Sequence, residues 1–504
     1  MRIDKSLKNI YYAVLSYGSI FILSLILRKV FLKYLDVELL GIEGVLGNLF
    51  SLMALVDVGT GSLITYLLYK AFSENDKEEV SILMGMYRNM YFLIAVVMTL
   101  ISIILIPLLP YFISSETVEW KYVLCIYFMK LLGMIGSYCY SYRRLLFKVD
   151  QCEFVCTKVD MITCYLKYTS WLAVLLAWHS YFLYLSVEIL AVLGANIYIA
   201  CLSKIKYPYA TGKGVGLREY RERNFFKDMK NTYLIKIART IFGSTDNLVV
   251  SVFLGLKSVA LLSNYLLITT TISQGFAKLL MPLRGSIGNF VYQETNERCI
   301  QLFKMFDMFA FVTGSTIACV FACSVNCFIS LWIGNQYTFD MTTVIFISYT
   351  LYFGFVSHFT TCFRDVLGRF ELDRNYAISG ALLNIIISIL LVKQIGIAGV
   401  YIGTIFGVLG FWSGRYRVLK TDLFKRGIGY FVIQTKYLTL YTLFLCSSYI
   451  LCKCIDNSII GFGYKILISF IVPFFLNYII FRKSREFEMI KSYMMQSLKI
   501  LRKR

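Results

Sequence analysis

Long apolar runs, separated by loops that are either rich or poor in basic residues, limit the folds that this chain can adopt. Fourteen runs are long enough to cross a bilayer as helices, which takes about 20 residues each. Of 504 residues, 58% are hydrophobic, more than one soluble core can use. Because backbone polar groups must be satisfied inside the membrane, we expect an all-α polytopic membrane protein with about 14 transmembrane helices. The predicted spans are residues 10–32, 42–66, 90–112, 121–141, 159–178, 181–203, 231–254, 259–280, 306–332, 342–363, 375–395, 398–418, 435–455 and 461–481.

The loops between these runs alternate between many and few basic residues. Six of the 51 Lys and Arg lie in one set of short loops, and 38 lie in the other set, which includes both termini. Cytoplasmic loops carry an excess of Lys and Arg, so both termini and the basic loops are predicted to be cytoplasmic. Membrane orientation and anionic headgroups therefore account for the net charge of +21, and no nucleic-acid partner is expected. The basic segments are residues 1–9, 69–89, 142–158, 204–230, 284–304, 364–374, 415–436 and 482–504.

Other features argue against a nucleotide-driven pump, a metal centre and disulfides. Residues 211–216 read Thr-Gly-Lys-Gly-Val-Gly, which lacks the Gly-Lys-Ser/Thr ending of a phosphate loop, so no nucleotide site is predicted. Most of the 14 Cys lie within apolar runs, and there are only two His. Neither a metal site nor a disulfide framework is therefore predicted. We expect no cofactor beyond a coupling proton or sodium ion.

The spans group into two halves and a tail. Residues 1–203 are predicted to form an N-terminal lobe of six spans, and residues 231–418 a second lobe of six spans. Residues 204–230 would be a basic cytoplasmic linker, and residues 419–504 would hold spans 13 and 14 and a basic cytoplasmic tail. Because each half begins on the same side and has an even number of helices, the lobes would be pseudo-symmetric around a central cavity, related by an axis along the membrane normal.

Seven cations remain inside the predicted spans, where a charged side chain costs roughly 2.5–3.5 kcal/mol at bilayer depth and usually marks function. Several of them belong to polar stripes at helical spacing. One such stripe in span 7 consists of Lys236, Arg239, Gly243 and Asp246. The other stripes are Asn264, Gln274 and Lys278 in span 8, Glu43 and Asp57 in span 2, and Tyr17, Ser24 and Arg28 in span 1; Lys130 lies in span 4 and Lys167 in span 5.

Two interpretations of these buried charges stay open. They could be structural ion pairs between helices, for instance Arg28 with Asp57 or Asp160 with Lys167. Alternatively, stripes on paired helices of the two halves would line a hydrated cavity, and an excess of cations there favours an anion such as pyrophosphate. Glu188, Asp307 and His358 are further buried candidates in spans 6, 9 and 10.

Short motifs in the first ninety residues resemble a known family. The sequences Arg28-Lys29-Val30-Phe31, Gly47-Asn48-Leu49-Phe50 and Asp57-Val58-Gly59 are similar to those of Wzx-type polysaccharide flippases. These proteins belong to the multidrug/oligosaccharidyl-lipid/polysaccharide (MOP) exporter superfamily. Asp246-Asn247 and Ser263-Asn264-Tyr265 resemble the signature of its second half. Arg28 matches the family's arginine in span 1, whereas Asp57 stands where the family often has Glu.

The resemblance implies a function, a substrate and a location. It implies a flippase, not an enzyme, that moves an undecaprenyl-pyrophosphate-linked oligosaccharide from the inner to the outer leaflet by alternating access. The pathway would be O-antigen, capsule or exopolysaccharide synthesis in the bacterial cytoplasmic (inner) membrane, with polysaccharide assembly proteins as partners of a monomer. The substrate-binding cations would be Arg28, Lys130, Lys167, Lys236, Arg239 and Lys278. Asp57, Asp246 and Glu43 would pair with these cations or bind the coupling ion, and Asn264, Gln274, Ser24 and Tyr17 would line the cavity.

Two other functions are considered. A multispan polysaccharide polymerase or ligase would act on the same lipid-linked substrates, but it would need sizeable extracytoplasmic loops, and those of this chain are mostly short. A MATE-like exporter of small organic cations would need an acidic and aromatic cavity, whereas cations are in excess here. Transfer of labelled undecaprenyl-pyrophosphate sugar across vesicles would separate the three functions.

Overall fold

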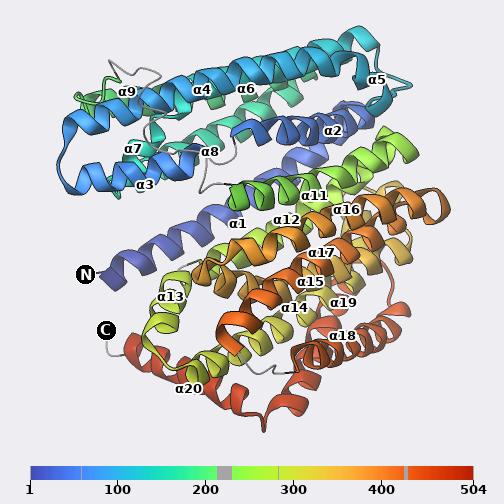
Figure 1. Ribbon diagram of the computed structural model, residues 1–504. Helices are drawn as coiled ribbons and strands as arrows, with labels where there is room; N and C mark the ends of the chain where they lie inside the picture. The colour runs from blue at the N-terminus through green and yellow to red at the C-terminus, as the bar shows by residue number, and fades with distance from the viewer. Residues whose placement is uncertain (1, 58–59, 213–229, 282, 425–428, 503–504) are drawn as a thin grey trace. The chain divides into compact units, whose positions relative to one another are not determined.

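The computed structural model describes residues 2–57, 60–212, 230–281, 283–424 and 429–502. Every regular element in these residues is a helix, as the apolar runs predict (Figure 1). By compactness the chain divides into two units. One is Leu15–Ala260, called here the first unit, and the other is Met1–Val14 with Leu261–Arg504, called the second unit. The lobe boundary predicted at residues 204–230 stays a prediction, and most of that segment lies outside the described residues.

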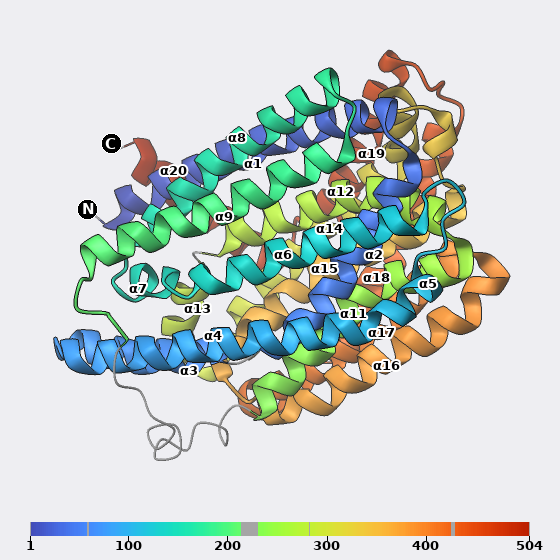
Figure 2. The ribbon, with the colours of Figure 1, turned by 90° about the horizontal axis from the view of Figure 1, so that it is seen from above.

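The first unit contains the helices that follow the start of α1. Short capping side chains begin several of them: Asp36 accepts a hydrogen bond from the backbone of Glu38 at α2, and Asp76 one from Glu79 at α4. The elements are α1 (Arg2–Tyr34), α2 (Val37–Met53), η1 (Ala54–Asp57), α3 (Thr60–Ser73), α4 (Lys77–Leu105), η2 (Ile106–Leu108), α5 (Leu109–Phe112), α6 (Trp120–Ser141), α7 (Arg144–Val149), α8 (Glu153–Ala177), α9 (Tyr181–Lys206) and α11 (Lys230–Leu254). In Figure 2, α8 and α9 run side by side.

The second unit begins within α12 and is built around long packed helices. The elements are α12 (Leu256–Leu280), α13 (Leu283–Gln293), α14 (Asn296–Trp332), η3 (Asn335–Tyr337), α15 (Met341–Leu367), α16 (Phe370–Ile395), α17 (Ile397–Leu419), η4 (Lys420–Phe424), α18 (Tyr430–Lys453), α19 (Ile459–Phe481) and α20 (Arg485–Arg502). Its core is rich in buried aromatic residues, among them Phe303, Phe311, Tyr352 and Tyr441.

Small residues let α16 and α17 approach closely. A Cβ atom added at Gly410 would lie 2.7 Å from the Cα atom of Gly380, and one added at Gly380 would lie 2.7 Å from the carbonyl oxygen of Gly407. The two helices are joined at Gly396, whose φ of +62° and ψ of −141° are accessible to glycine almost alone. The glycine run from 396 to 410 thus supports close helix packing.

The length and hydropathy of the helices are those of a multi-pass membrane protein. Within the described residues, ten helices are long and apolar enough to cross a membrane, and the bent pair α12 and α13 would make eleven. Predicted spans 1, 5 and 13 also coincide with helices, α1, α8 and α18, of 33, 25 and 24 residues. The all-α polytopic fold is therefore confirmed.

Predicted span 2 is not one continuous α-helix. The α2 helix ends at Met53, a 3₁₀ turn covers Ala54–Asp57, and α3 begins at Thr60. A single helical face through Glu43 and Asp57 is therefore wrong, because the turn changes the angular spacing of the side chains that follow it. The glycines at positions 59 and 61 have low helix propensity and weaken this part of the run.

Candidate functional site

A cluster of charged and aromatic side chains lies inside the first unit, between α1, α2, α8 and α9. We call it the inner cluster and define it as Arg28, Glu43, Tyr168, Trp171, Tyr181 and Tyr184. The guanidinium of Arg28 on α1 interacts electrostatically with Glu43 on α2 and with Tyr184 and Tyr168. Glu43 interacts in turn with Tyr181 and Tyr184. The carboxylate beside Arg28 thus comes from the neighbouring helix.

Helical spacing brings the aromatic members of the inner cluster together. Tyr168 and Trp171 are three residues apart on α8, and Tyr181 and Tyr184 are three apart on α9, so each pair shares a face. The Trp171 and Tyr184 rings are stacked with centroids 4.4 Å apart. The indole Nε1 of Trp171 also donates a hydrogen bond of 2.9 Å to the carbonyl oxygen of Tyr184. The ring of Phe31 on α1 packs edge-on against the rings of Tyr181 and Tyr184.

One hydroxyl of the inner cluster has no partner in the described part of the chain. Tyr181 is 1% exposed, and its hydroxyl group makes no hydrogen bond there. A buried donor without a partner costs about 1–3 kcal/mol, so such groups call for an explanation. A bound polar ligand or a water molecule would satisfy the hydroxyl of Tyr181.

Two predicted substrate-binding cations have partners beside the inner cluster. The ammonium of Lys167 lies 4.4 Å from the ring centroid of Trp171, in a cation–π contact. The ammonium of Lys130 on α6 lies 3.5 Å from a carboxylate oxygen of Glu188 on α9. These contacts reduce the cost of both charges inside the helix bundle, so neither cation requires an anionic ligand.

The ion pair considered between Asp160 and Lys167 is wrong. Asp160 instead accepts two hydrogen bonds from Arg144 on α7, of 2.8 and 2.7 Å. Arg144 also donates to Asn196, whose amide donates to Ser137 on α6. This chain of contacts fastens α6, α7, α8 and α9 together, and we assign it a structural role.

Asp57 has a separate aromatic environment in the first unit. It ends the η1 turn and interacts electrostatically with Tyr87 and Tyr91 on α4 and with Tyr138 on α6. The hydroxyls of Tyr87 and Tyr91 are 2.9 Å apart and hydrogen-bonded. Thus the structure places Asp57 among tyrosines of α4 and α6 and Glu43 among those of α8 and α9.

The polar stripe of α11 lies on an uncovered face. Lys236, Arg239 and Gly243 are exposed, and Asp246 is half-buried. A Cβ atom added at Gly243 would meet no atom within 4 Å. The packing face of α11 is instead turned to α2. The predicted stripe therefore presents two cations on the surface of the first unit, where a ligand can reach them.

In the second unit, the residues of the polar stripe predicted on α12 differ in burial. Asn264 is fully buried, whereas Gln274 and Lys278 are exposed near the C-terminal end of the helix. Arg284, in the helix that follows, lies 3.9 Å from a carboxylate oxygen of Asp365. Sequence reasoning counted Arg284 only as a loop cation, because its position just after an apolar run gives no sign of a partner on α15.

The remaining cavity-lining predictions gain little support. Ser24 donates a 2.7 Å hydrogen bond to the carbonyl oxygen of Phe21 in its own helix. The side chain of Tyr17 lies outside the described residues. Sequence reasoning also missed Tyr168, Trp171, Tyr181 and Tyr184. Their spacing within each helix was a usable signal, but it does not tell which helices face each other.

Comparisons with known proteins identify the fold. No family model and no curated protein matches the sequence. An inward-facing multidrug resistance MATE family transporter of the MOP superfamily matches with a TM-score of 0.63 and 14% identity, covering 81% of this chain and 96% of its own. The lipid II flippase MurJ, in an inward closed conformation, matches with a TM-score of 0.62 and 16% identity, covering 93% of this chain and 98% of its own.

A third structure is consistent with these two. A MOP superfamily transporter from Pyrococcus furiosus matches with a TM-score of 0.53 and 14% identity, covering 80% of this chain and 93% of its own. The chain therefore has the fold of MOP superfamily transporters. The fold implied by the sequence motifs is therefore confirmed, whereas the resemblance to Wzx-type flippases stays a prediction.

Proposed function

We propose that the protein is a flippase for an undecaprenyl-pyrophosphate-linked oligosaccharide in the bacterial cytoplasmic membrane, with both termini cytoplasmic. The exposed cations of α11, Lys236 and Arg239, are the observation that carries this proposal. They lie on one helical face of a MOP-type fold, and basic side chains are suited to the oxygens of a pyrophosphate. In the second unit, exposed Lys278 offers a further cation.

The inner cluster does not favour a free organic cation. Its rings are buried against one another, and the hydroxyl of Tyr181 is an unsatisfied donor, which suits a polar ligand without positive charge. A MATE-like exporter of organic cations is the second candidate, because a MATE structure matches as well as MurJ and because Glu43 is acidic. The face of Trp171 already holds the ammonium of Lys167, however, and Arg28 adds a second positive charge. Positive charge at this position disfavours a cationic ligand.

Translocation in proteoliposomes tests the proposal. The full-length protein would be reconstituted with undecaprenyl-pyrophosphate oligosaccharide carrying a fluorescent label, and appearance of the label in the outer leaflet would be followed by quenching. We expect the wild type to move the label and the double variant Lys236→Ala/Arg239→Ala to do so at least tenfold more slowly. Arg298→Ala is the matched control, because Arg298 is an exposed cation in an i,i+4 pair with Glu294.

The outcomes separate the candidate functions. Unchanged transfer by the double variant, at the same protein level as wild type, would contradict the role of α11. Absence of lipid transfer by the wild type, together with uptake of an organic cation such as ethidium, would favour the MATE-like function. We also propose a proton or sodium ion as the coupling ion, a monomeric state and polysaccharide assembly proteins as partners.

A further inference from the structure

A carboxyl group lies inside the second unit, away from the predicted polar stripes. Asp307 is on α14, the long helix at the centre of this unit, and is 4% exposed. One carboxylate oxygen, Oδ2, accepts a 2.7 Å hydrogen bond from the amide Nε2 of Gln434 on α18. Gln434 is itself 5% exposed. The pair thus joins two helices within the apolar core.

Two oxygens of this pair make no hydrogen bond, although the hydroxyl of Tyr430 lies near the carboxyl. Neither Oδ1 of Asp307 nor Oε1 of Gln434 has a partner among the described residues. Both atoms are acceptors when the carboxyl is ionised, so they cannot satisfy each other. One added proton changes this, because a protonated Oδ1 is a donor. In general, a carboxylic acid can donate to the oxygen of a primary amide while it accepts from the NH₂ group of the same amide.

The surroundings provide no compensating positive charge. The titratable groups that face Asp307 are Tyr352 on α15 and Tyr430 and Tyr437 on α18. Glu486 on α20 interacts with Tyr437, and among the described residues burial, Gln434 and Tyr430 are the influences on Asp307, with no Lys, Arg or His among them. Ionised, this carboxyl would be a buried charge without a counter-charge, which costs several kcal/mol.

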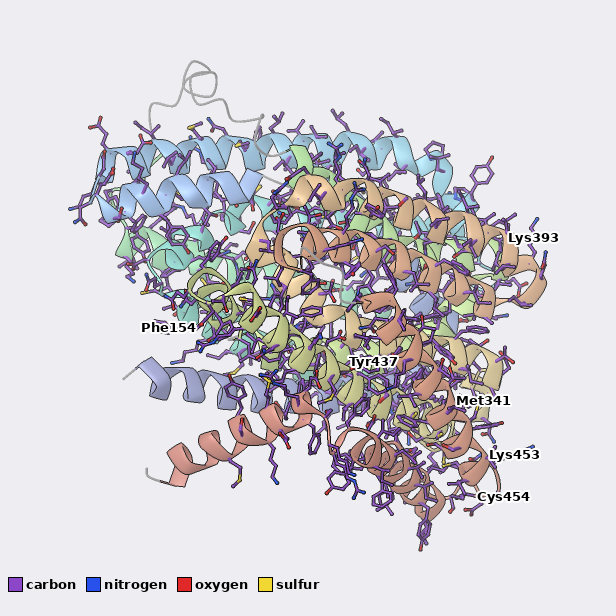
Figure 3. The ribbon with its side chains drawn as sticks, turned by 60° about the horizontal axis from the view of Figure 1, so that its bottom comes forward. Phe154, Met341, Lys393, Tyr437, Lys453 and Cys454 are labelled. Carbon is purple, nitrogen blue, oxygen red and sulfur yellow. The ribbon has the colours of Figure 1, made fainter. Side chains whose placement is uncertain are left out.

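Polar groups connect Asp307 to two further helices. Tyr430, whose hydroxyl faces the carboxyl, is hydrogen-bonded at 3.1 Å to Thr360 on α15. The indole Nε1 of Trp412 on α17 donates to the same threonine hydroxyl at 3.2 Å. These contacts connect Asp307, on α14, with residues of α15, α17 and α18. Figure 3 shows Tyr437 along α18, with Lys453 and Cys454 at the far end of that helix.

A purely structural role for Asp307 is the competing explanation. One hydrogen bond between α14 and α18 is also within the capacity of an Asn or Gln side chain, which brings no charge to bury. Unlike an amide, a carboxyl group at this position can bind and release a proton. The two orphaned oxygens fit a bound proton better than a structural carboxylate.

We propose that Asp307 is a proton-binding site of this transporter, protonated in the conformation described here and deprotonated at another stage of the cycle. The carboxylate takes a proton from hydronium, leaving water, and returns it to water when the helices around it rearrange. Proton binding changes the charge of the second unit's core by one, and proton release restores it before the cycle ends. The coupling to transport rests on the proposed flippase function, whereas proton binding itself does not.

Infrared spectroscopy of the full-length protein in lipid tests proton binding directly. At neutral pH we expect the carbonyl stretch of a protonated carboxyl group, and we expect Asp307→Asn to remove it. Asp340→Asn is the matched control, because Asp340 is an exposed helix cap far from the core of the unit. Gln434→Leu keeps the carboxyl but removes the amide, so it should shift the band and provides a test if Asp307→Asn does not fold. Absence of any band that responds to Asp307→Asn or Gln434→Leu would overturn the proposal.

A second measurement tests coupling. In the proteoliposome assay, an imposed pH gradient should change the rate of lipid transfer by wild type, while Asp307→Asn should transfer lipid at a rate that is independent of the gradient. An equal response of wild type and variant would refute coupling through Asp307. A wild type that transfers no lipid at all would refute the flippase function, and the infrared band would still decide whether Asp307 binds a proton.

Discussion

Arg144 on α7 holds both carboxylate oxygens of Asp160 on α8, with hydrogen bonds of 2.8 and 2.7 Å. Asp160 is therefore paired with Arg144, and not with Lys167 on the same helix, which the sequence suggested as a partner. It lies in a structural connection between α6, α7, α8 and α9, outside the inner cluster. The expected consequence is that the pair affects stability more than transport.

We therefore expect Arg144→Ala to lower the free energy of unfolding by roughly 1 kcal/mol, a value reduced for the partial exposure of Asp160. The change removes both hydrogen bonds to Asp160 and one to Asn196. Thermal unfolding in detergent would measure it. Arg298→Ala, which breaks an exposed i,i+4 pair, should change stability by no more than about 0.5 kcal/mol. Equal effects of the two substitutions would contradict the structural role of Arg144.

The stacked indole of Trp171 should be needed to hold α8 and α9 together. Trp171 is 6% exposed, so Trp171→Ala removes a buried ring and should lower the free energy of unfolding by about 3–5 kcal/mol. Trp171→Phe keeps part of the stack and loses the hydrogen bond to Tyr184, so its loss should be smaller. The exposed Trp178 is the control, since it is 64% exposed. If Trp178→Ala destabilised the protein as much as Trp171→Ala, the packing argument would fail.

Close packing of α16 on α17 predicts that alanine substitution destabilises the protein at Gly410 but not at Gly354, which lies on another helix. Gly410→Ala places a Cβ atom 2.7 Å from the Cα atom of Gly380, so the helices must separate, at a cost of about 1–3 kcal/mol. Gly354→Ala, on α15, meets no atom within 4 Å and should be neutral or stabilising by up to about 1 kcal/mol, since Ala favours a helix over Gly. Thermal unfolding of the two variants side by side would check the difference. The expectation fails if Gly410→Ala is as stable as Gly354→Ala.

Asp150, between α7 and α8, should make stability depend on pH. Burial would raise the pKa of Asp150, but hydrogen bonds from Lys206 and Tyr207 outweigh it and hold that pKa below its usual value. The ionised carboxyl therefore stabilises the folded state above the unfolded pKa of about 3.9, and this stabilisation is lost as pH falls through the folded pKa. The effect is modest because the side chain is 35% exposed.

Thermal unfolding at pH 7 and pH 3 measures this dependence. Asp150→Asn should be less stable than wild type at pH 7, with the difference shrinking at pH 3, because below a pKa of about 3.9 the unfolded wild-type chain binds a proton at Asp150. A difference that is the same at both pH values would mean that the charge of Asp150 does not contribute. Asp340→Asn, at an exposed cap of α15, tests whether any Asp gives this result.

Properties that depend on local sequence were predictable. Hydropathy located most of the helices, because the apolar solvent acts on each run separately, although α4 begins at Lys77 and α14 at Asn296, well before the predicted starts at residues 90 and 306. Helical periodicity correctly placed Lys236, Arg239 and Gly243 on one face of α11, since they lie in one unbroken helix. Where a helix is interrupted, as at Ala54–Asp57, the same periodicity fails. The assignment of these residues to a substrate stays a prediction.

Hydropathy and helical periodicity were enough to predict a polytopic helical membrane protein and the helices on which its unusual charges lie. The tertiary structure was needed to identify partners that lie on other helices: Arg144 for Asp160, Glu188 for Lys130 and Gln434 for Asp307. Hydropathy and helical periodicity act over neighbouring residues, whereas the partner of a buried charge depends on which helices pack together, and that is settled by contacts between segments far apart in the chain.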